Sequence, residues 1–226
     1  MFIGSRMMMK PSATSDPYFA DVVLLLHMDG ANGGTTFTDS SSSGKIATPT
    51  LTTTETSVFK YGTAAGVFNG SSSYLYVPAS TDWAFSTGDF TLECWVNPNA
   101  VSAQQTLFGN SYSAAFSAKL DGSNLAIWLA GTLYSGSVSV VPGSFQHVAW
   151  VRVSGTLTTY VNGVGHLLSS SATNNVASSP NPLGVGINHS NGTEYYGGYI
   201  DDLRITKGIA RYTGNFTPPT QAFPNQ

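Results

Sequence analysis

The sequence predicts an all-β fold, with two antiparallel sheets packed as a β-sandwich in one domain. Short apolar runs repeat along the 226 residues and are separated by turn-forming pairs such as Asn69-Gly70. No segment shows a sustained helical period, and only 82–85 and 206–212 could form single helical turns. About a dozen strands with turns at this spacing are typical of a sandwich or a barrel.

Turn chemistry separates the predicted strands from the first to the last. In chain order they are 22–28, 65–68, 74–78, 90–96, 106–110, 114–120, 125–130, 147–153, 156–161, 183–187 and 198–205. Residues 121–124, Asp-Gly-Ser-Asn, join two of these strands and suit a hairpin loop. The Ser- and Thr-rich segments 35–45 and 167–182 are expected to be loops.

The stretch FQHVAWVRVSGTLTTYVNGV, residues 145–164, contains two tight turns. Ser154-Gly155 and Asn162-Gly163 each separate two runs of β-forming residues, and Asn-Gly in particular favours a two-residue hairpin turn. The stretch therefore predicts a three-stranded meander whose third strand starts at Val164, as one face of a sandwich requires.

The chain divides into an extended N-terminal arm (1–17), a sandwich domain (18–217) and a Pro-rich C-terminal tail (218–226). The arm has no hydrophobic period and is rich in Met, whose flexible side chains fill irregular apolar grooves. We therefore expect the arm to dock on another chain, either a second copy in a homo-oligomer or a scaffold protein of a particle. The alternative is an arm folded back on its own domain.

Composition narrows the function classes. Charged residues make up 9% of the chain, against about 25% in average domains. The net charge of −3 argues against a nucleic-acid partner. No apolar run approaches the ~20 residues of a membrane span, and residues 1–11 lack the apolar core of a signal peptide. The single cysteine, Cys94, alternates with apolar residues and is expected to be a small buried hydrophobe.

Four segments, taken together and in order, resemble the laminin G-like, concanavalin A-like jelly-roll domains. They are LLLHMDGANGGTTFTDSSSSG (24–44), GDFTLECWVNP (88–98), FQHVAWVRVSGTLTTYVNGV (145–164) and GYIDDLRITKGIARYTGNFTPP (198–219). The resemblance covers nearly the whole predicted domain and implies a jelly-roll sandwich. The version of the last segment found here, RITKGIARYTGNFTPP, is similar to domains in bacteriophage virion proteins and in proteins of aquatic bacteria and their phages.

The resemblance implies a non-enzymatic virion surface protein, as a head decoration or as a tail or fibre component. Its location would be the particle surface, its partners other virion proteins held through the arm, and its candidate ligand a host-surface glycan. A free-standing bacterial carbohydrate-binding lectin module is the alternative, and a glycan hydrolase is a third interpretation.

The acidic residues do not suit catalysis. Retaining glucanases, which the resembled superfamily includes, need two carboxyl groups ~5–5.5 Å apart. None of the three glutamates, Glu55, Glu93 and Glu194, has an acidic residue two positions further along its predicted strand. The four histidines are too far apart for metal-ligand spacing, so we predict no enzymatic activity and no required cofactor.

Candidate sugar-binding residues come from aromatic and planar polar side chains. In strand 90–96 one face should be the core, while the other places Glu93 beside Trp95 as a sugar platform. Alternatively, Trp95 covers the outer sheet or contacts a neighbouring subunit. Segment 189–198 combines Asn, Glu and a Tyr pair and could bind a glycan or another protein. The further candidates are Tyr112, Trp128, Tyr134, Tyr195 and Tyr196.

A Ca²⁺ site is a further hypothesis, since some jelly rolls of the resembled family hold Ca²⁺ near the first and last strands. The candidate ligands are Asp29, Asp39, Asp201 and Asp202, which offer the oxygen atoms that Ca²⁺ prefers. Strict alternation in 198–205 places Asp201 on the apolar face, where a carboxylate needs hydrogen bonds or a cation. A β-bulge at Asp201-Asp202 would instead place both outside.

Overall fold

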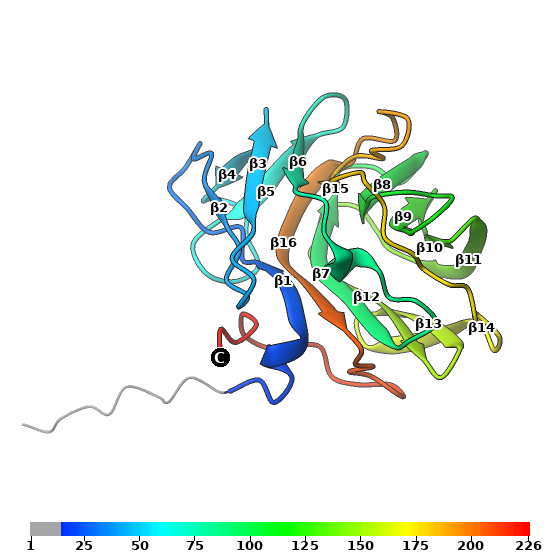
Figure 1. Cartoon of the computed structure of the whole chain (residues 1–226). Coiled ribbons are helices and arrows are strands. Elements are labelled where there is room, and N and C mark those ends of the chain that lie inside the picture. Colours follow the sequence, from blue (N-terminus) through cyan, green and yellow to red (C-terminus); the bar gives the residue numbers. More distant parts are fainter. Residues whose placement is uncertain (1–14) are drawn as a thin grey trace, which may run out of the picture.

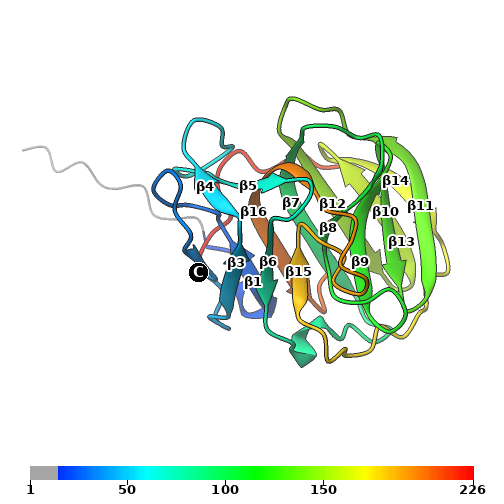
Figure 2. The same ribbon diagram turned by 90° about the horizontal axis from the view of Figure 1, so that it is seen from above.

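The computed structural model describes residues 15–226 and confirms the antiparallel two-sheet sandwich (Figures 1 and 2). All but the last three residues of the predicted arm lie outside the described residues, and so does its expected docking. From residue 15 onward, no helix is long and apolar enough to span a bilayer. The helical turn expected at 82–85 corresponds to the 3-10 turn Thr81–Trp83. The helical turn expected at 206–212 does not form, because the last strand continues to Lys207.

Sheet I contains eight strands and carries both ends of the described chain. Its order is β14 (Val164–Ser169), β13 (Thr156–Val161), β12 (Gln146–Val153), β7 (Phe90–Pro98), β16 (Gly197–Lys207), β5 (Ala65–Asn69) and β4 (Thr53–Glu55), with β1 (Val22–Leu26) also paired to β16. The predicted meander is confirmed as β12-β13-β14. Its turn residues have positive φ angles, 49° at Ser154 and 49° at Asn162, each followed by a glycine of positive φ.

Sheet II also contains eight strands. Its order is β11 (Thr132–Ser139), β10 (Asn124–Leu129), β9 (Phe116–Asp121), β8 (Gln104–Gly109), β15 (Leu183–Val185), β6 (Tyr74–Val77), β3 (Ile46–Thr50) and β2 (Phe37–Thr38). Every predicted strand overlaps an observed one. The strands that the sequence did not predict are β2, β3, β4 and β11, three of which end a sheet. Edge strands bury few side chains and therefore need no clear apolar alternation.

The core lies between the two sheets. Strand β7 alternates as predicted, and Phe90, Leu92, Cys94 and Val96 point into this core with no exposed surface. Cys94 is thus a buried apolar residue as expected, and burial raises the pKa of its thiol well above the usual value.

A β-bulge interrupts strand β16. Its register with β7 shifts between Asp201 and Arg204, and Asp202 has a φ of 48°. Ile200 and Leu203 consequently both face the core, while Asp201 lies opposite Trp95 on the outer face of sheet I. The bulge hypothesis is confirmed, and the placement of Asp201 on the apolar face is wrong.

Residues 208–226 form a C-terminal strap that covers the outer face of sheet I (Figure 1). Tyr212 and Phe216 pack on β12 and β13, and Phe223 packs on β1. The backbone N–H of Asp16 donates to the carbonyl of Gln226 at 2.6 Å, so the described chain ends lie side by side. The Pro-rich tail from 218 onward is therefore part of the folded domain, and 217 is not a structural boundary.

Candidate functional site

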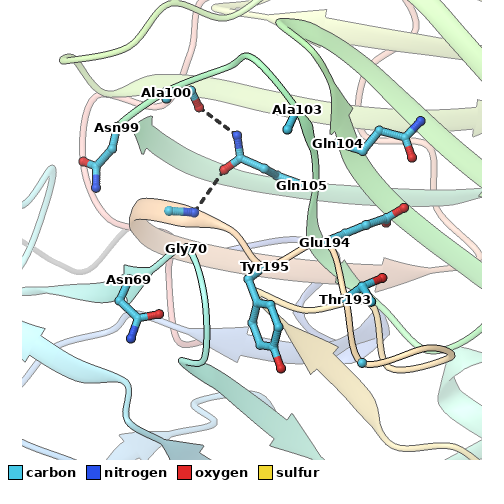
Figure 3. A pocket seen from close by; sticks show the side chains of 12 residues that line it. Asn69, Gly70, Asn99, Ala100, Ala103, Gln104, Gln105, Thr193, Glu194 and Tyr195 are labelled. Atoms are coloured by element: carbon cyan, nitrogen blue, oxygen red, sulfur yellow. Dashed lines mark hydrogen bonds between the residues drawn. The ribbon is translucent and has the colours of Figure 1, made fainter.

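A pocket of about 550 Å³ lies at one end of the sandwich, where strands β5 and β7 end and β8 and β16 begin (Figure 3). Three loops form it: 69–70 after β5, 99–103 between β7 and β8, and 192–197 before β16. Its larger side chains are mostly amides, with one carboxylate and one aromatic ring. They are Asn69, Asn99, Gln104, Gln105, Glu194 and Tyr195.

Hydrogen bonds between the loops hold the pocket in shape. The buried Gln105 amide donates to the carbonyl of Ala100 at 2.7 Å and accepts from the N–H of Gly197 at 3.0 Å, which links two of the loops (Figure 3). The Asn69 side-chain oxygen accepts three backbone N–H groups from residues 71–73, at 2.9–3.1 Å, and fixes the third loop. A pocket built this way is already formed before a ligand arrives.

Glu194 forms one wall of the pocket and is tied to sheet II. Both of its carboxylate oxygens accept from Lys119 Nζ at 3.0 Å, and one also accepts from the hydroxyls of Thr106 and Tyr112. Glu194 has a φ of 56°, a left-handed conformation that non-glycine residues seldom adopt. Burial and the Glu194 carboxylate raise the pKa of Tyr112, so its hydroxyl stays protonated and donates.

Aromatic rings continue from the pocket along the outer face of β6. Tyr195 lies 6.4 Å from Tyr74, whose ring is 4.5 Å from that of Tyr76, and His189 meets Tyr76 edge-on at 4.8 Å. Each of these rings is half-buried. We call Tyr195, Tyr74 and Tyr76 the tyrosine strip.

The predicted aromatic candidates have different outcomes. Tyr195 lines the pocket, and Tyr112 contacts its Glu194 wall while stacking on Trp128 at 5.1 Å. Tyr134 donates to Asn174 on a different part of sheet II and does not line the pocket. Tyr196 has no exposed surface and packs against Phe68 in the core, so no ligand can reach it.

The expected platform of Glu93 and Trp95 is closed to ligands, because the C-terminal strap and the loop after β4 cover it. Glu93 has no exposed surface, and Tyr212 donates to its carboxylate at 2.7 Å. Burial alone would raise the pKa of Glu93, but Arg204 and His147 hold it far below its usual range. Trp95 is 4% exposed, with Lys60 Nζ 4.2 Å above its ring. Trp95 therefore packs within its own chain.

The four aspartates considered for Ca²⁺ do not gather into one site. Asp39 accepts from the backbone N–H groups of Ser41 and Lys45 and from that of Leu25 on β1, at 2.8–3.0 Å, and Asp202 pairs with His27 at 2.5 Å. Asp29 accepts from Thr63 and Ala64, while Asp201 accepts from the N–H groups of Lys60 and Tyr61. Among residues 15–226, no group of three or more His, Cys, Asp or Glu side chains is arranged to hold a metal ion.

Sequence reasoning pointed to segment 189–198 but missed the amides that complete the pocket, Asn69, Asn99, Gln104 and Gln105. These amides follow or begin strands far apart in the chain, so their proximity depends on strand order. One signal was available: turn residues at Asn69-Gly70 and Asn97-Pro98 mark strand ends, and strands that run parallel in space end on the same side.

Comparison with known proteins supports the fold. Residues 68–209, more than half of the chain, match the sequence profile described as the concanavalin A-like lectin/glucanases superfamily. No curated protein sequence matches the chain.

Three solved structures illustrate the similarity. Domain 4 of AbnA, an extracellular arabinanase of Geobacillus stearothermophilus, is 20% identical with a TM-score of 0.65, covering 84% of this chain and 94% of its own. The binding domain of Paraclostridial Mosquitocidal Protein 1 is 14% identical, with a TM-score of 0.64 and 85% and 50% coverage. The binding domain of Botulinum Neurotoxin DC is 12% identical, with a TM-score of 0.62 and 85% and 49% coverage. The chain thus spans about half of each toxin domain, and identities this low show a shared fold alone.

Proposed function

The chain belongs to the concanavalin A-like lectin/glucanases superfamily, and on this premise we propose that it is a non-enzymatic carbohydrate-binding module. The ligand enters the pocket between loops 69–70, 99–103 and 192–197. Two similar structures were determined with sugar-type ligands, the AbnA domain with arabinotriose and the Botulinum Neurotoxin DC domain with SialylT. They support the proposal as analogies of fold.

The observation that carries this proposal is the composition of the pocket. Sugars offer hydroxyl groups and apolar C–H faces, which are recognised by planar amides and by aromatic rings. The pocket supplies both in a preformed cavity: Asn99 has an exposed amide with no hydrogen bond to another described residue, and Tyr195 has a partly exposed ring. A few placed polar groups beside an aromatic surface are typical of small-ligand sites.

The positions of the carboxylates support the proposed lack of catalysis. Glycoside hydrolysis uses two carboxyl groups flanking one bond. Glu194 is the one acidic residue among the described lining residues, and Lys119 already pairs with it at 3.0 Å. Glu93 is buried under the strap and bound to Arg204 at 2.8 Å, out of reach of a substrate. We therefore expect glycans to leave the protein uncleaved.

A glycan array followed by calorimetry tests the proposal. We expect binding to at least one glycan class, a fall in affinity of about tenfold or more for Asn99→Ala and Tyr195→Ala, and no products by chromatography after long incubation. Asn32→Ala, at an exposed Asn elsewhere on the surface, is the matched control. Binding to no glycan, or unchanged binding by both pocket variants, would refute the assignment of the site.

A proposal for the biological setting of the module comes from the sequence. Residues 204–219, RITKGIARYTGNFTPP, resemble domains of phage virion proteins, so we propose that this module is displayed on a phage particle through its N-terminal arm. Mass spectrometry of purified particles tests this directly. Absence of the chain from particles would favour a free-standing bacterial lectin module instead.

A further inference from the structure

The tyrosine strip is continuous with the pocket, and this continuity bears on the size of the ligand. Tyr195 lines the pocket with its side chain while its ring lies 6.4 Å from Tyr74. Tyr74 and Tyr76 alternate on β6 with the fully buried Leu75 and Val77, so both rings stand on the outer face of sheet II. The strip therefore leads out of the pocket along a strand.

The strip offers apolar surface that the fold itself does not need to cover. Its three rings remain partly exposed and are tilted rather than stacked flat, at interplanar angles of 40° and 37°. Partly exposed aromatic side chains grouped on one surface mark binding sites more often than isolated exposed residues do. Sugar rings, whose C–H faces pack on aromatic faces, fit such a surface when a chain extends beyond the pocket.

Charge around the pocket bears on the chemistry of the ligand. None of its described lining residues is Lys, Arg or His. The neighbouring Lys119 is 1% exposed, and its ammonium already donates to Glu194 at 3.0 Å and to Gln104 at 2.9 Å. An ammonium has three donors, and the two Glu194 oxygens and the Gln104 oxygen already occupy them, with the Tyr112 hydroxyl a further 3.3 Å contact. A carboxylate or sulfate in the pocket would find no free cation and would face Glu194.

We propose that the ligand is an uncharged oligosaccharide, with one sugar unit in the pocket and the following units on the tyrosine strip. This inference rests on the proposed function and specifies its ligand class. Acidic glycans, such as sialylated, sulfated or uronic acid chains, are disfavoured because the desolvated anion has no compensating partner.

Calorimetry with a length series of uncharged oligosaccharides tests the strip. The series is built on the neutral sugar that binds best on the array, from the monosaccharide to the pentasaccharide. We expect affinity to rise by about tenfold or more between one and three units and then to level off. Tyr76→Ala should remove most of this gain while the monosaccharide binds as before. Phe59→Ala, at another exposed aromatic residue outside the strip, should change neither.

Stability is checked by thermal unfolding of each variant. If Tyr76→Ala is unfolded, Tyr74→Ala replaces it, and the length series on the unmodified chain remains decisive by itself. Equal affinity for one sugar unit and for five would refute ligand binding on the tyrosine strip, while leaving the assignment of the pocket intact.

Adding a positive charge to the pocket tests the preference for uncharged chains. Asn99→Lys places a cation at the pocket, and we expect it to gain binding to sialylated or uronic acid glycans that the unmodified chain ignores. Thr213→Lys, which adds the same charge on the strap over sheet I, should gain none. Tighter binding of acidic than of neutral glycans by the unmodified chain would overturn the inference while leaving the proposed function intact. Binding of no glycan at all would instead refute the proposed function.

Discussion

Glu93 lies within a buried network of charges on the outer face of sheet I. Arg204 donates to its carboxylate at 2.9 Å, His147 Nε2 lies 3.1 Å from it, and Asp16 contacts Arg204 from the other side at 3.1 Å. Buried charges are tolerated only when each is paired. The residue that seemed best placed for a sugar platform thus helps to hold the strap and the start of the described chain on the sheet.

Replacing Glu93 by Gln should destabilise the domain strongly. The substitution leaves the Arg204 guanidinium buried with half of its compensating charge, and loss of one partner in a buried pair costs about 3–5 kcal/mol. Chemical denaturation measures the change in the free energy of unfolding. Glu55→Gln, on the surface, serves as control and should change it little. A Glu93→Gln variant as stable as the unmodified chain would show that the network adds nothing to stability.

Asp201 should make stability depend on pH between 4 and 7. Burial raises its pKa from 3.8 to about 7, and the charges of Asp202 and Asp29 add to the rise. The folded state then binds a proton that the unfolded state releases, so stability falls as pH rises through this window. His27, whose pKa is also raised, loses its contribution only as pH rises above about 6.5.

The variant Asp201→Asn isolates this effect, because it keeps an oxygen to accept from Lys60 and Tyr61 but cannot titrate. The free energies of unfolding at pH 4.5 and pH 7.5, measured by denaturation, should differ less in the variant than in the unmodified chain, by on the order of 2 kcal/mol. Parallel pH profiles for the two proteins would contradict a raised pKa at Asp201.

The β12-β13-β14 meander is the element that the sequence predicted best, because its strands pair through two tight turns with local sequence signals. The two turns nevertheless differ in what surrounds them. Gly163 has a φ of 78°, and a Cβ there would overlap the carbonyl oxygen of Phe216 in the strap. Gly155 has a φ of 81°, and a Cβ there would meet only the Thr173 methyl group, at 3.3 Å.

Alanine substitutions at these two glycines should therefore have unequal effects. Both variants carry the backbone strain of a positive φ, about 1–3 kcal/mol, but Gly163→Ala must also displace the strap. We expect Gly163→Ala to lower the melting temperature clearly more than Gly155→Ala. Equal losses would mean that the strap is not packed against this turn.

Strand β16 shows where local patterns stop being informative. Alternation along 198–205 predicted Asp201 on the apolar face, but the bulge shifts every later residue by one position. The bulge coincides with a change of neighbour, from β5, which pairs with 197–200, to β1, which pairs with 203–206. Which strands flank β16 is set by the order of the whole sheet, and a single strand's sequence does not encode it.

At the scale of the molecule, the same distinction separates what could be predicted from what could not. Period-2 alternation is local, so the fold class, the core face of β7 and the burial of Cys94 were all predictable. The pocket unites Asn69, Gln105 and Tyr195 through strand order, and the strap covers Glu93 through a packing of residues over a hundred positions apart. Both the pocket and the strap contact depend on how the strands are arranged in the assembled sheets.

The folded unit begins before Pro17, within the predicted arm. The sequence placed residues 1–17 in an arm, yet Asp16 is 8% exposed and its carboxylate accepts from Arg211 at 2.7 Å as well as from Arg204 at 3.1 Å. A chain starting at Pro17 should therefore be less stable than one starting at Ser15, by on the order of 2 kcal/mol, because two buried guanidinium groups lose a hydrogen-bonded partner. Asp16→Asn in the full chain should reproduce most of the loss. Urea denaturation of these three proteins and of the unmodified chain measures the free energy of unfolding. Equal stability of the two truncated chains would show that Asp16 is not part of the folded unit.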